Sequence, residues 1–180
     1  IKTLKNVIQK AKKLKGKILT IGITNQRETT VLWDKKTGKT IYKAIVWQDR
    51  RTEDYCKKLR KQNRDTTIFN KTGLLIDPYF SGTKIKWILD NVSNAKNLMN
   101  KNQLLFGTID SFLIWRLTKG KVHATDATNA SRTMIYNISS NKWDDSILKL
   151  LKINKSILPE VKDCADDFGL THPSITGRLI

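Results

Sequence analysis

The side chains best suited to chemistry begin with Arg27 and Glu28, which follow an apolar run over residues 18–24. A guanidinium only donates hydrogen bonds and a carboxylate only accepts them, so the pair could bind hydroxyl groups, which do both. An ordinary salt bridge at the end of a strand is an equally good interpretation. Adjacent residues of a regular strand point to opposite faces, so both side chains can share a pocket only if the strand ends or bulges there.

Two aromatic residues extend this pattern. Trp47 ends the apolar run Ala44–Trp47 and is followed by the polar residues 48–51. Its ring could line the carbon side of a small polyol, although core packing is the commoner use of such a ring. Tyr79 precedes a predicted helix, so its hydroxyl could bind a ligand. Polar residues after strands are typical of ligand sites in α/β sheets.

The common local signatures of phosphate, dinucleotide, zinc and serine-hydrolase sites are missing from the sequence. His123 and His172 are isolated, and we expect structural or solvated roles for both. Cys56 and Cys164 have no Cys-x-x-Cys spacing, which argues against a zinc or redox motif and against a disulfide framework.

The elements that must position these residues alternate between strand-like and helical patterns. We expect strands at Ile18–Thr24, Thr29–Asp34, Thr40–Trp47 and Leu104–Gly107, with the second and third forming a hairpin. We expect helices over residues 1–14, after the potential caps Thr52, Ser81 and Thr108, and over Asp144–Leu151, with an ordered loop over residues 63–80. The pattern predicts an α/β fold with a mixed sheet.

The composition is that of one globular domain with a strong positive charge. The chain has 180 residues and 34 Lys and Arg against 16 Asp and Glu, a formal net charge of +18. The excess is 26 Lys to 8 Arg, whereas nucleic-acid surfaces favour Arg, so we do not expect a nucleic-acid partner. The dense lysines of residues 2–17 surround an apolar stripe that starts at Ile1, which indicates a solvated helix face more than a binding patch.

No apolar run exceeds four residues, so we expect neither a membrane span nor a secretory signal peptide. A reducing cytoplasm suits the cysteine content. Because Ile1 already lies inside a helical period and is not a methionine, we expect the chain to be a fragment that begins partway into a domain.

Taken together, the polar stretches resemble the carbohydrate kinases that have the actin and hexokinase type of ribonuclease H-like fold. The pattern Tyr79-x-Ser81-x-x-Lys84-Ile85-x-Trp87-Ile88-x-Asp90-Asn91 fits the signature of the whole family. Residues 25–30 and 77–84 resemble the glycerol kinases within it, and residues 106–110, 125–126 and 128–133 extend the likeness. The resemblance implies that residues 1–180 form an incomplete N-terminal, glycerol-binding domain.

By this resemblance, Arg27 and Glu28 would hold glycerol hydroxyls, Tyr79 would add a hydrogen bond, and Trp47 would pack against the carbon chain. The family transfers a phosphoryl group from ATP with Mg²⁺ and an aspartate base. The phosphate loop would precede Ile1, the base would follow Ile180, and the nucleotide domain would lie elsewhere. We therefore expect no catalytic residue, metal ligand or cofactor in this chain, and no activity from it in isolation.

The intact enzyme would be a cytoplasmic homo-oligomer with glycerol and ATP as its small-molecule partners. A kinase for another polyol or sugar, and a basic ribonuclease H-like module that binds nucleic acid, remain the alternative interpretations.

Overall fold

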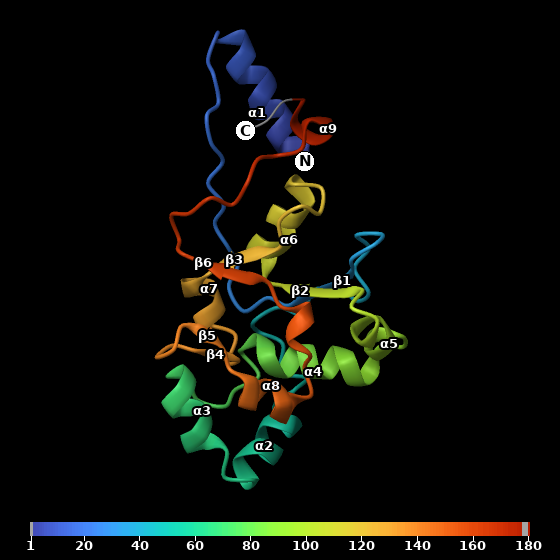
Figure 1. Cartoon of the computed structure of the whole chain (residues 1–180), viewed down its shortest axis with the longest axis vertical. Helices are drawn as coiled ribbons and strands as arrows, with labels where there is room; N and C mark the ends of the chain where they lie inside the picture. Colours follow the sequence, from blue (N-terminus) through green and yellow to red (C-terminus); the bar gives the residue numbers. More distant parts are fainter. Residues whose placement is uncertain (1, 178–179) are drawn as a thin grey trace.

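The computed structural model describes residues 2–177 and 180. Figure 1 shows an elongated arrangement in which α1 and α9 lie at one end, α2 and α3 lie at the other, and the longer strands cross the middle. The helices are α1 (Lys2–Lys13), α2 (Glu53–Lys61), α3 (Asp65–Thr72), α4 (Ser81–Asn91), α5 (Ala95–Asn100), α6 (Ile109–Leu117), α7 (Ala127–Ser131), α8 (Asp145–Leu151) and α9 (Pro173–Thr176), with a 3-10 turn at Lys155–Ile157.

The strands are short and pair two by two. They are β1 (Val31–Asp34), β2 (Leu104–Gly107), β3 (Ala124–Asp126), β4 (Tyr136–Asn137), β5 (Lys142–Trp143) and β6 (Glu160–Lys162). β1 runs antiparallel to β2 with Val31 opposite Gly107, β3 runs parallel to β6, and β4 runs antiparallel to β5. The described strands thus mix parallel and antiparallel pairs in three small sheets, and not in the single mixed sheet that the sequence suggested.

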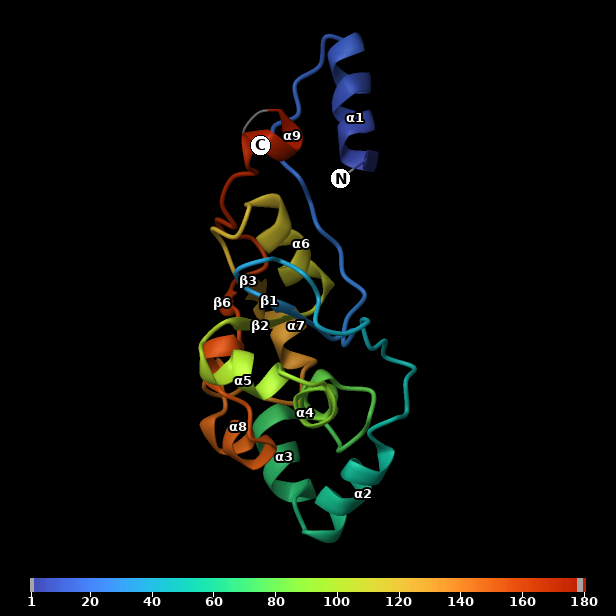
Figure 2. The same ribbon diagram turned by 90° about the vertical axis from the view of Figure 1, so that its right-hand side faces the viewer.

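Two of the predicted strands are wrong in detail. Ile18–Thr24 is extended but belongs to no sheet within the described part of the chain; it runs from α1 toward the middle of the molecule (Figure 2). The expected hairpin partner Thr40–Trp47 forms only isolated bridges, Trp33 with Thr40 and Thr30 with Ile45. The regular partner of β1 is β2, which pairs with all four residues of β1.

Most of the predicted helices are present, but the loop predicted over residues 63–80 is wrong. Residues 63–80 contain α3, which buries Ile68 and Thr72 and ends at Gly73 in the left-handed region, where φ is 69°. Thr52 and Thr108 stand just before α2 and α6, but neither side chain makes a capping hydrogen bond. Asp144 does cap α8, because it accepts from the backbone N–H groups at 146 and 147.

The main core lies between α4 and the strands and helices around it. Ile85, Ile88 and Leu89 of α4 are buried together with Leu104 and Phe106 of β2. This packing fixes α4 beneath β2, and α4 carries Ser81 and Lys84, whose side chains bond to the carbonyl of Glu28 in the site described below.

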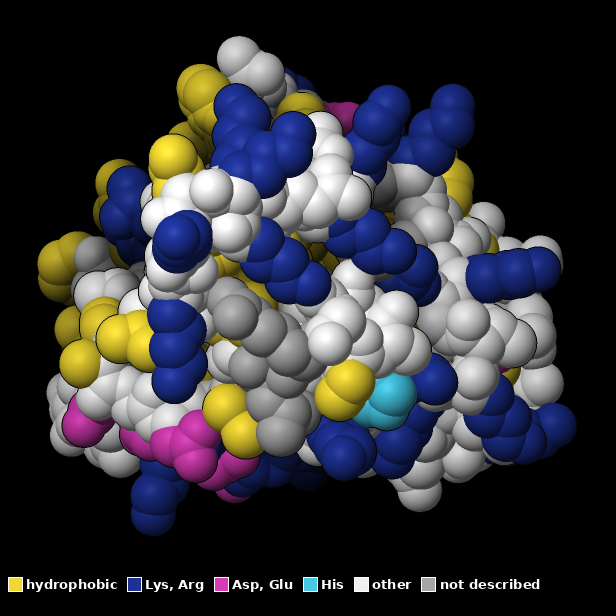
Figure 3. All heavy atoms as spheres, turned by 90° about the horizontal axis from the view of Figure 1, so that it is seen from above, with side chains coloured by type: hydrophobic (Ala, Val, Ile, Leu, Met, Phe, Trp, Pro, Cys, Tyr) yellow, Lys and Arg dark blue, Asp and Glu magenta, His cyan; other side chains and the backbone are white. Residues whose placement is uncertain are grey.

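The lysines of α1 are exposed to solvent, as predicted, and the helix buries few of its apolar side chains. Ile8 is its buried side chain, whereas Val7 and Leu14 are exposed, and Ile1 lies outside the described residues. Lys and Arg side chains are spread over the upper face of the molecule, which Figure 3 shows. None of the described helices is long and apolar enough to cross a membrane.

Candidate functional site

The backbone at Arg27 and Glu28 forms a turn, so these residues do not alternate between the faces of a strand. Glu28 has a φ of 63°, in the left-handed region that a non-glycine residue seldom occupies. The chain regains a bridge at Thr30, whose N–H donates to the carbonyl of Ile45 over 2.9 Å. The condition for a shared pocket is therefore met, because no regular strand separates the two side chains.

The turn is anchored through Asn25. Its side-chain amide donates to Oδ1 of Asn129 over 2.8 Å, and its Oδ1 accepts from the backbone N–H of Asp110 over 3.2 Å. Asn129 in turn donates to Asp126 over 2.6 Å. Burial raises the pKa of Asp110, although its carboxylate accepts from the hydroxyl of Thr125. This hydrogen-bond network ties the turn to the starts of α6 and α7.

Glu28 is only 2% exposed, and its two functional groups have different partners. Its carboxylate Oε1 accepts from Nε of Arg132 over 2.8 Å. Its backbone carbonyl accepts from the hydroxyl of Ser81 over 3.2 Å and from Nζ of Lys84 over 3.1 Å. Within the described part of the chain, Oε2 of Glu28 has no hydrogen-bond partner, so one oxygen of a buried carboxylate is left to accept a ligand.

Tyr79 and Trp47 lie together beside this group. Their ring centroids are 5.6 Å apart with the planes inclined by 59°. Trp47 is 38% exposed, which places it at the surface and not in the core, the alternative that its sequence context favoured. Tyr79 is half-buried, and among the described residues its hydroxyl has no hydrogen-bond partner. Trp47 can therefore present a ring face to a small molecule, and Tyr79 can present its hydroxyl.

Arg132 joins the carboxylate to the aromatic residues. The centre of its guanidinium lies 5.8 Å from the ring centroid of Tyr79 and 5.0 Å from that of Phe80. The structure thus brings Glu28, Tyr79 and Trp47 into one connected group. Arg27 is exposed and makes no hydrogen bond or ion pair within the described residues, so its membership of the same cleft stays a prediction.

Sequence reasoning missed Arg132 and Lys84 as contributors to this group. Arg132 falls in a stretch that carried the family resemblance, yet its chemistry gave no hint of a partner 104 positions away. Gly82 is the signal that could have indicated close packing. A Cβ atom there would lie 2.9 Å from Ile135 and 3.0 Å from the carbonyl of Thr133, so only glycine lets α4 approach the segment that carries Arg132.

The polar residues after Trp47 mostly bind one another. Arg51 donates to both oxygens of Asp49 and stacks over the ring of Trp87 at 4.5 Å. The hydrogen bond from Arg51 holds the pKa of Asp49 below its ordinary value. Arg50 pairs with Asp77 over 2.9 Å. These contacts position the loop and leave little free donor capacity for a ligand.

The two histidines and two cysteines have other surroundings. His123 shares a hydrogen bond of 2.7 Å with the carbonyl of Phe106, and burial lowers its pKa to about 4. His172 caps α9. Cys56 is buried and Cys164 is exposed, and both are free thiols.

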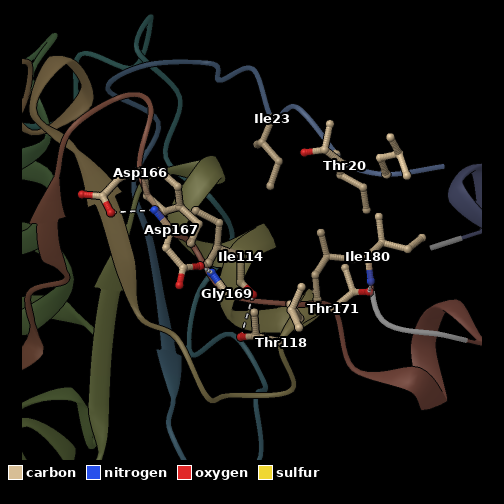
Figure 4. A pocket seen from close by; sticks show the side chains of 14 residues that line it. Thr20, Ile23, Ile114, Thr118, Asp166, Asp167, Gly169, Thr171 and Ile180 are labelled. Atoms are coloured by element: carbon tan, nitrogen blue, oxygen red, sulfur yellow. Dashed lines mark hydrogen bonds between the residues drawn. The ribbon is translucent and has the colours of Figure 1, made fainter.

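A separate hollow of about 260 Å³ lies away from these residues (Figure 4). Ile23 and Thr20 line one side of it, and Ile114, Thr118 and residues 166–171 line the other. Its walls combine aliphatic side chains with threonines and aspartates, and none of Arg27, Glu28, Trp47 or Tyr79 takes part. Among the described residues, no group of three or more His, Cys, Asp or Glu side chains could hold a metal ion.

The sequence profile of the FGGY family of carbohydrate kinases, N-terminal domain, matches residues 1–179. The chain belongs to this family. The chain is also 57% identical to a glycerol kinase of Rhizobium meliloti over 180 residues, which are all of this chain and 36% of that protein. A glycerol kinase of Borrelia duttonii is 58% identical over 165 residues, or 92% of this chain and 33% of that protein.

Solved structures of FGGY-type kinases have the same fold. A glycerol kinase of Plasmodium falciparum with ADP superposes with a TM-score of 0.90 at 38% identity, covering 98% of this chain and 37% of that one. A xylulose kinase of Lactobacillus acidophilus gives a TM-score of 0.75 at 26% identity, covering 94% of this chain and 32% of that one. The predicted α/β class and actin-like fold are confirmed, and the chain spans about a third of the length of these relatives.

Proposed function

We propose that this chain is the glycerol-binding part of a glycerol kinase. The intact protein would transfer the terminal phosphoryl group of ATP to a terminal hydroxyl of glycerol. The observation that carries the proposal is the buried Glu28 carboxylate, which Arg132 holds by one oxygen beside the free hydroxyl of Tyr79 and the ring of Trp47. The 57% identity to a protein named glycerol kinase supports the choice of substrate.

The chemistry of these groups suits glycerol. Each glycerol hydroxyl both donates and accepts, so Oε2 of Glu28 would accept a proton from one hydroxyl while the Tyr79 hydroxyl bonds to another. Trp47 would cover the carbon chain, which has no hydrogen-bonding capacity. Arg27, as an exposed and unpaired donor, would close on the ligand from the solvent side. The result would be one terminal hydroxyl held in a fixed direction for reaction.

In the reaction, the oxygen of that hydroxyl would form a bond to the terminal phosphorus of ATP as the bond from phosphorus to the ADP oxygen breaks, and the hydroxyl proton would pass to a base. Mg²⁺, when bound, would neutralise charge on the phosphates. The described residues offer no cluster that fits a metal, so we assign the metal, the base and the nucleotide contacts to other segments of the intact protein. On this proposal, residues 1–180 bind and orient the acceptor alcohol.

The proposal is tested with the purified intact protein, ATP and a panel of alcohols that includes glycerol, erythritol, xylulose and gluconate. We expect kcat/KM to be highest for glycerol. A higher value for a sugar or a longer polyol would transfer the assignment to that substrate. The isolated 180-residue chain should show no turnover, because positioning of both substrates and charge neutralisation are needed together. We also expect the intact kinase to be a homo-oligomer, which light scattering would test.

A further inference from the structure

Lys84 is a completely buried lysine at the first turns of α4, with a relative exposure of 0%. A charged side chain is rarely buried in this way unless it is paired, because desolvation of the ammonium is costly. Its Nζ donates to the backbone carbonyl of Tyr79 over 2.7 Å and to that of Glu28 over 3.1 Å. One ammonium therefore connects two segments of the candidate site that are far apart in sequence.

The carbonyl of Glu28 is the point where these contacts converge. It accepts from Lys84, from the hydroxyl of Ser81 over 3.2 Å and from the hydroxyl of Thr30 over 3.3 Å. Glu28 also occupies the left-handed region, a conformation that needs support from its surroundings. Fixing this peptide plane fixes the direction in which the Glu28 side chain leaves the backbone.

We infer that Lys84 is a positioning residue for the glycerol site, because its ammonium holds the backbones of Glu28 and Tyr79 in the arrangement that lets both side chains meet one polyol. The inference rests on the proposed function. Lys84 has no part in the reaction itself and reaches the substrate only through these two residues. Burial lowers the pKa of Lys84 to about 8, and the carboxylates of Glu28, Asp49 and Asp77 oppose this shift because they favour the charged ammonium.

The matched comparison is between two lysines of the same helix. Lys84→Met removes the ammonium but keeps an unbranched side chain one atom shorter. Lys86→Met removes the ammonium two positions further on, where Lys86 pairs with Asp90 and, within the described residues, bonds to no residue of the site. In the intact kinase we expect Lys84→Met to raise KM for glycerol about 10-fold or more and KM for ATP less than about 2-fold, and Lys86→Met to change neither.

A double-mutant cycle separates positioning from a merely structural role. Tyr79→Phe removes the hydroxyl and should raise KM for glycerol roughly 3-fold to 10-fold in the wild-type background. If Lys84 sets the geometry of Tyr79 against Glu28, the same substitution should cost less than about 2-fold in the Lys84→Met background. Equal effects in the two backgrounds would overturn the inference.

The outcomes for Lys84 and for the proposed function are distinguishable. If the wild-type kinase prefers another polyol, the glycerol assignment fails and the cycle is run with that polyol. If it phosphorylates no polyol, both proposals fail. If glycerol is the substrate and folded Lys84→Met has unchanged glycerol kinetics, the Lys84 inference alone fails. Should Lys84→Met not fold, Lys84→Gln keeps a neutral donor on a shorter side chain that would not reach both carbonyls, and an unchanged KM for glycerol in that variant would overturn the inference.

Discussion

Nε of Arg132 donates a hydrogen bond of 2.8 Å to Oε1 of Glu28, across 104 positions of the sequence. The same guanidinium lies beside the ring of Tyr79. Arg132 therefore contacts both the acceptor group and an aromatic wall of the candidate glycerol site. Arg132 occupies one carboxylate oxygen, and the other has no hydrogen-bond partner among the described residues.

Replacing Glu28 with Gln should impair glycerol use selectively. The amide keeps the shape of the side chain but exchanges one acceptor oxygen for a donor, which leaves a mismatched pair in a desolvated site. We expect kcat/KM for glycerol to fall about 5-fold to 150-fold, or roughly 1 to 3 kcal/mol, with KM for ATP nearly unchanged. Glu160→Gln, an exposed carboxylate on β6, is the matched control. Unaltered glycerol kinetics in a folded Glu28→Gln kinase would show that Glu28 forms only a structural ion pair.

Arg132→Met should destabilise the folded kinase, because it leaves the Glu28 carboxylate buried without its partner. We expect the free energy of unfolding to fall by roughly 1 to 3 kcal/mol, and adding Glu28→Gln to restore part of that loss. Urea denaturation of the two single variants and the double variant measures this coupling. Arg64→Met, at an exposed arginine, is the control. Strictly additive losses would contradict a direct interaction between the two residues.

Lys84 predicts a specific dependence of stability on pH. Its pKa is about 8 in the folded protein and about 10.4 in an unfolded chain. Between these values the unfolded state binds more protons, so folding stability rises with pH. Lys84→Met lacks this titration. The free energy of unfolding of the wild type, relative to that variant, should therefore increase by up to about 3 kcal/mol between pH 8 and pH 10.4. Urea titrations at several pH values test this, and a difference independent of pH would contradict it.

Gly82→Ala should weaken the packing that brings α4 to Arg132. The new methyl group would lie 2.9 Å from Ile135 and 3.0 Å from the carbonyl of Thr133, so one of them must move. We expect a loss of roughly 1 to 3 kcal/mol in the free energy of unfolding. Gly16→Ala is the control, since its Cβ would meet the nearest atom at an ordinary 3.4 Å. Equal thermal melting of the two variants would show that α4 can move without cost.

Local sequence patterns predicted the elements whose formation depends on residues close together in the sequence. β2 has the predicted bounds Leu104–Gly107, because an apolar run this short between polar residues suits a buried strand better than a helix. A helix was predicted after a cap at Ser81, but α4 already includes Ser81, and the serine hydroxyl bonds to the carbonyl of Glu28 and not to its own helix. The extended segment Ile18–Thr24 was predicted as a strand from its composition, which does not say whether a partner strand is present.

For the candidate site, too, the sequence predicted local features but not tertiary contacts. The chemistry of Arg27, Glu28, Trp47 and Tyr79 could be read from residue types at predicted junctions. The contacts that organise three of them could not, because they depend on tertiary approach. A lysine in an amphipathic helix normally points to solvent, so helical periodicity gave no reason to place Lys84 inside the protein.

The most direct test of the central claim is a crystal structure of the intact kinase with glycerol bound. We predict one glycerol hydroxyl within about 2.5 to 3.2 Å of a Glu28 carboxylate oxygen, another within the same range of Arg27 or the Tyr79 hydroxyl, and the carbon chain against Trp47. Glycerol bound away from these four residues, for example in the hollow beside Ile114, with the Glu28 carboxylate paired only to Arg132, would contradict the claim.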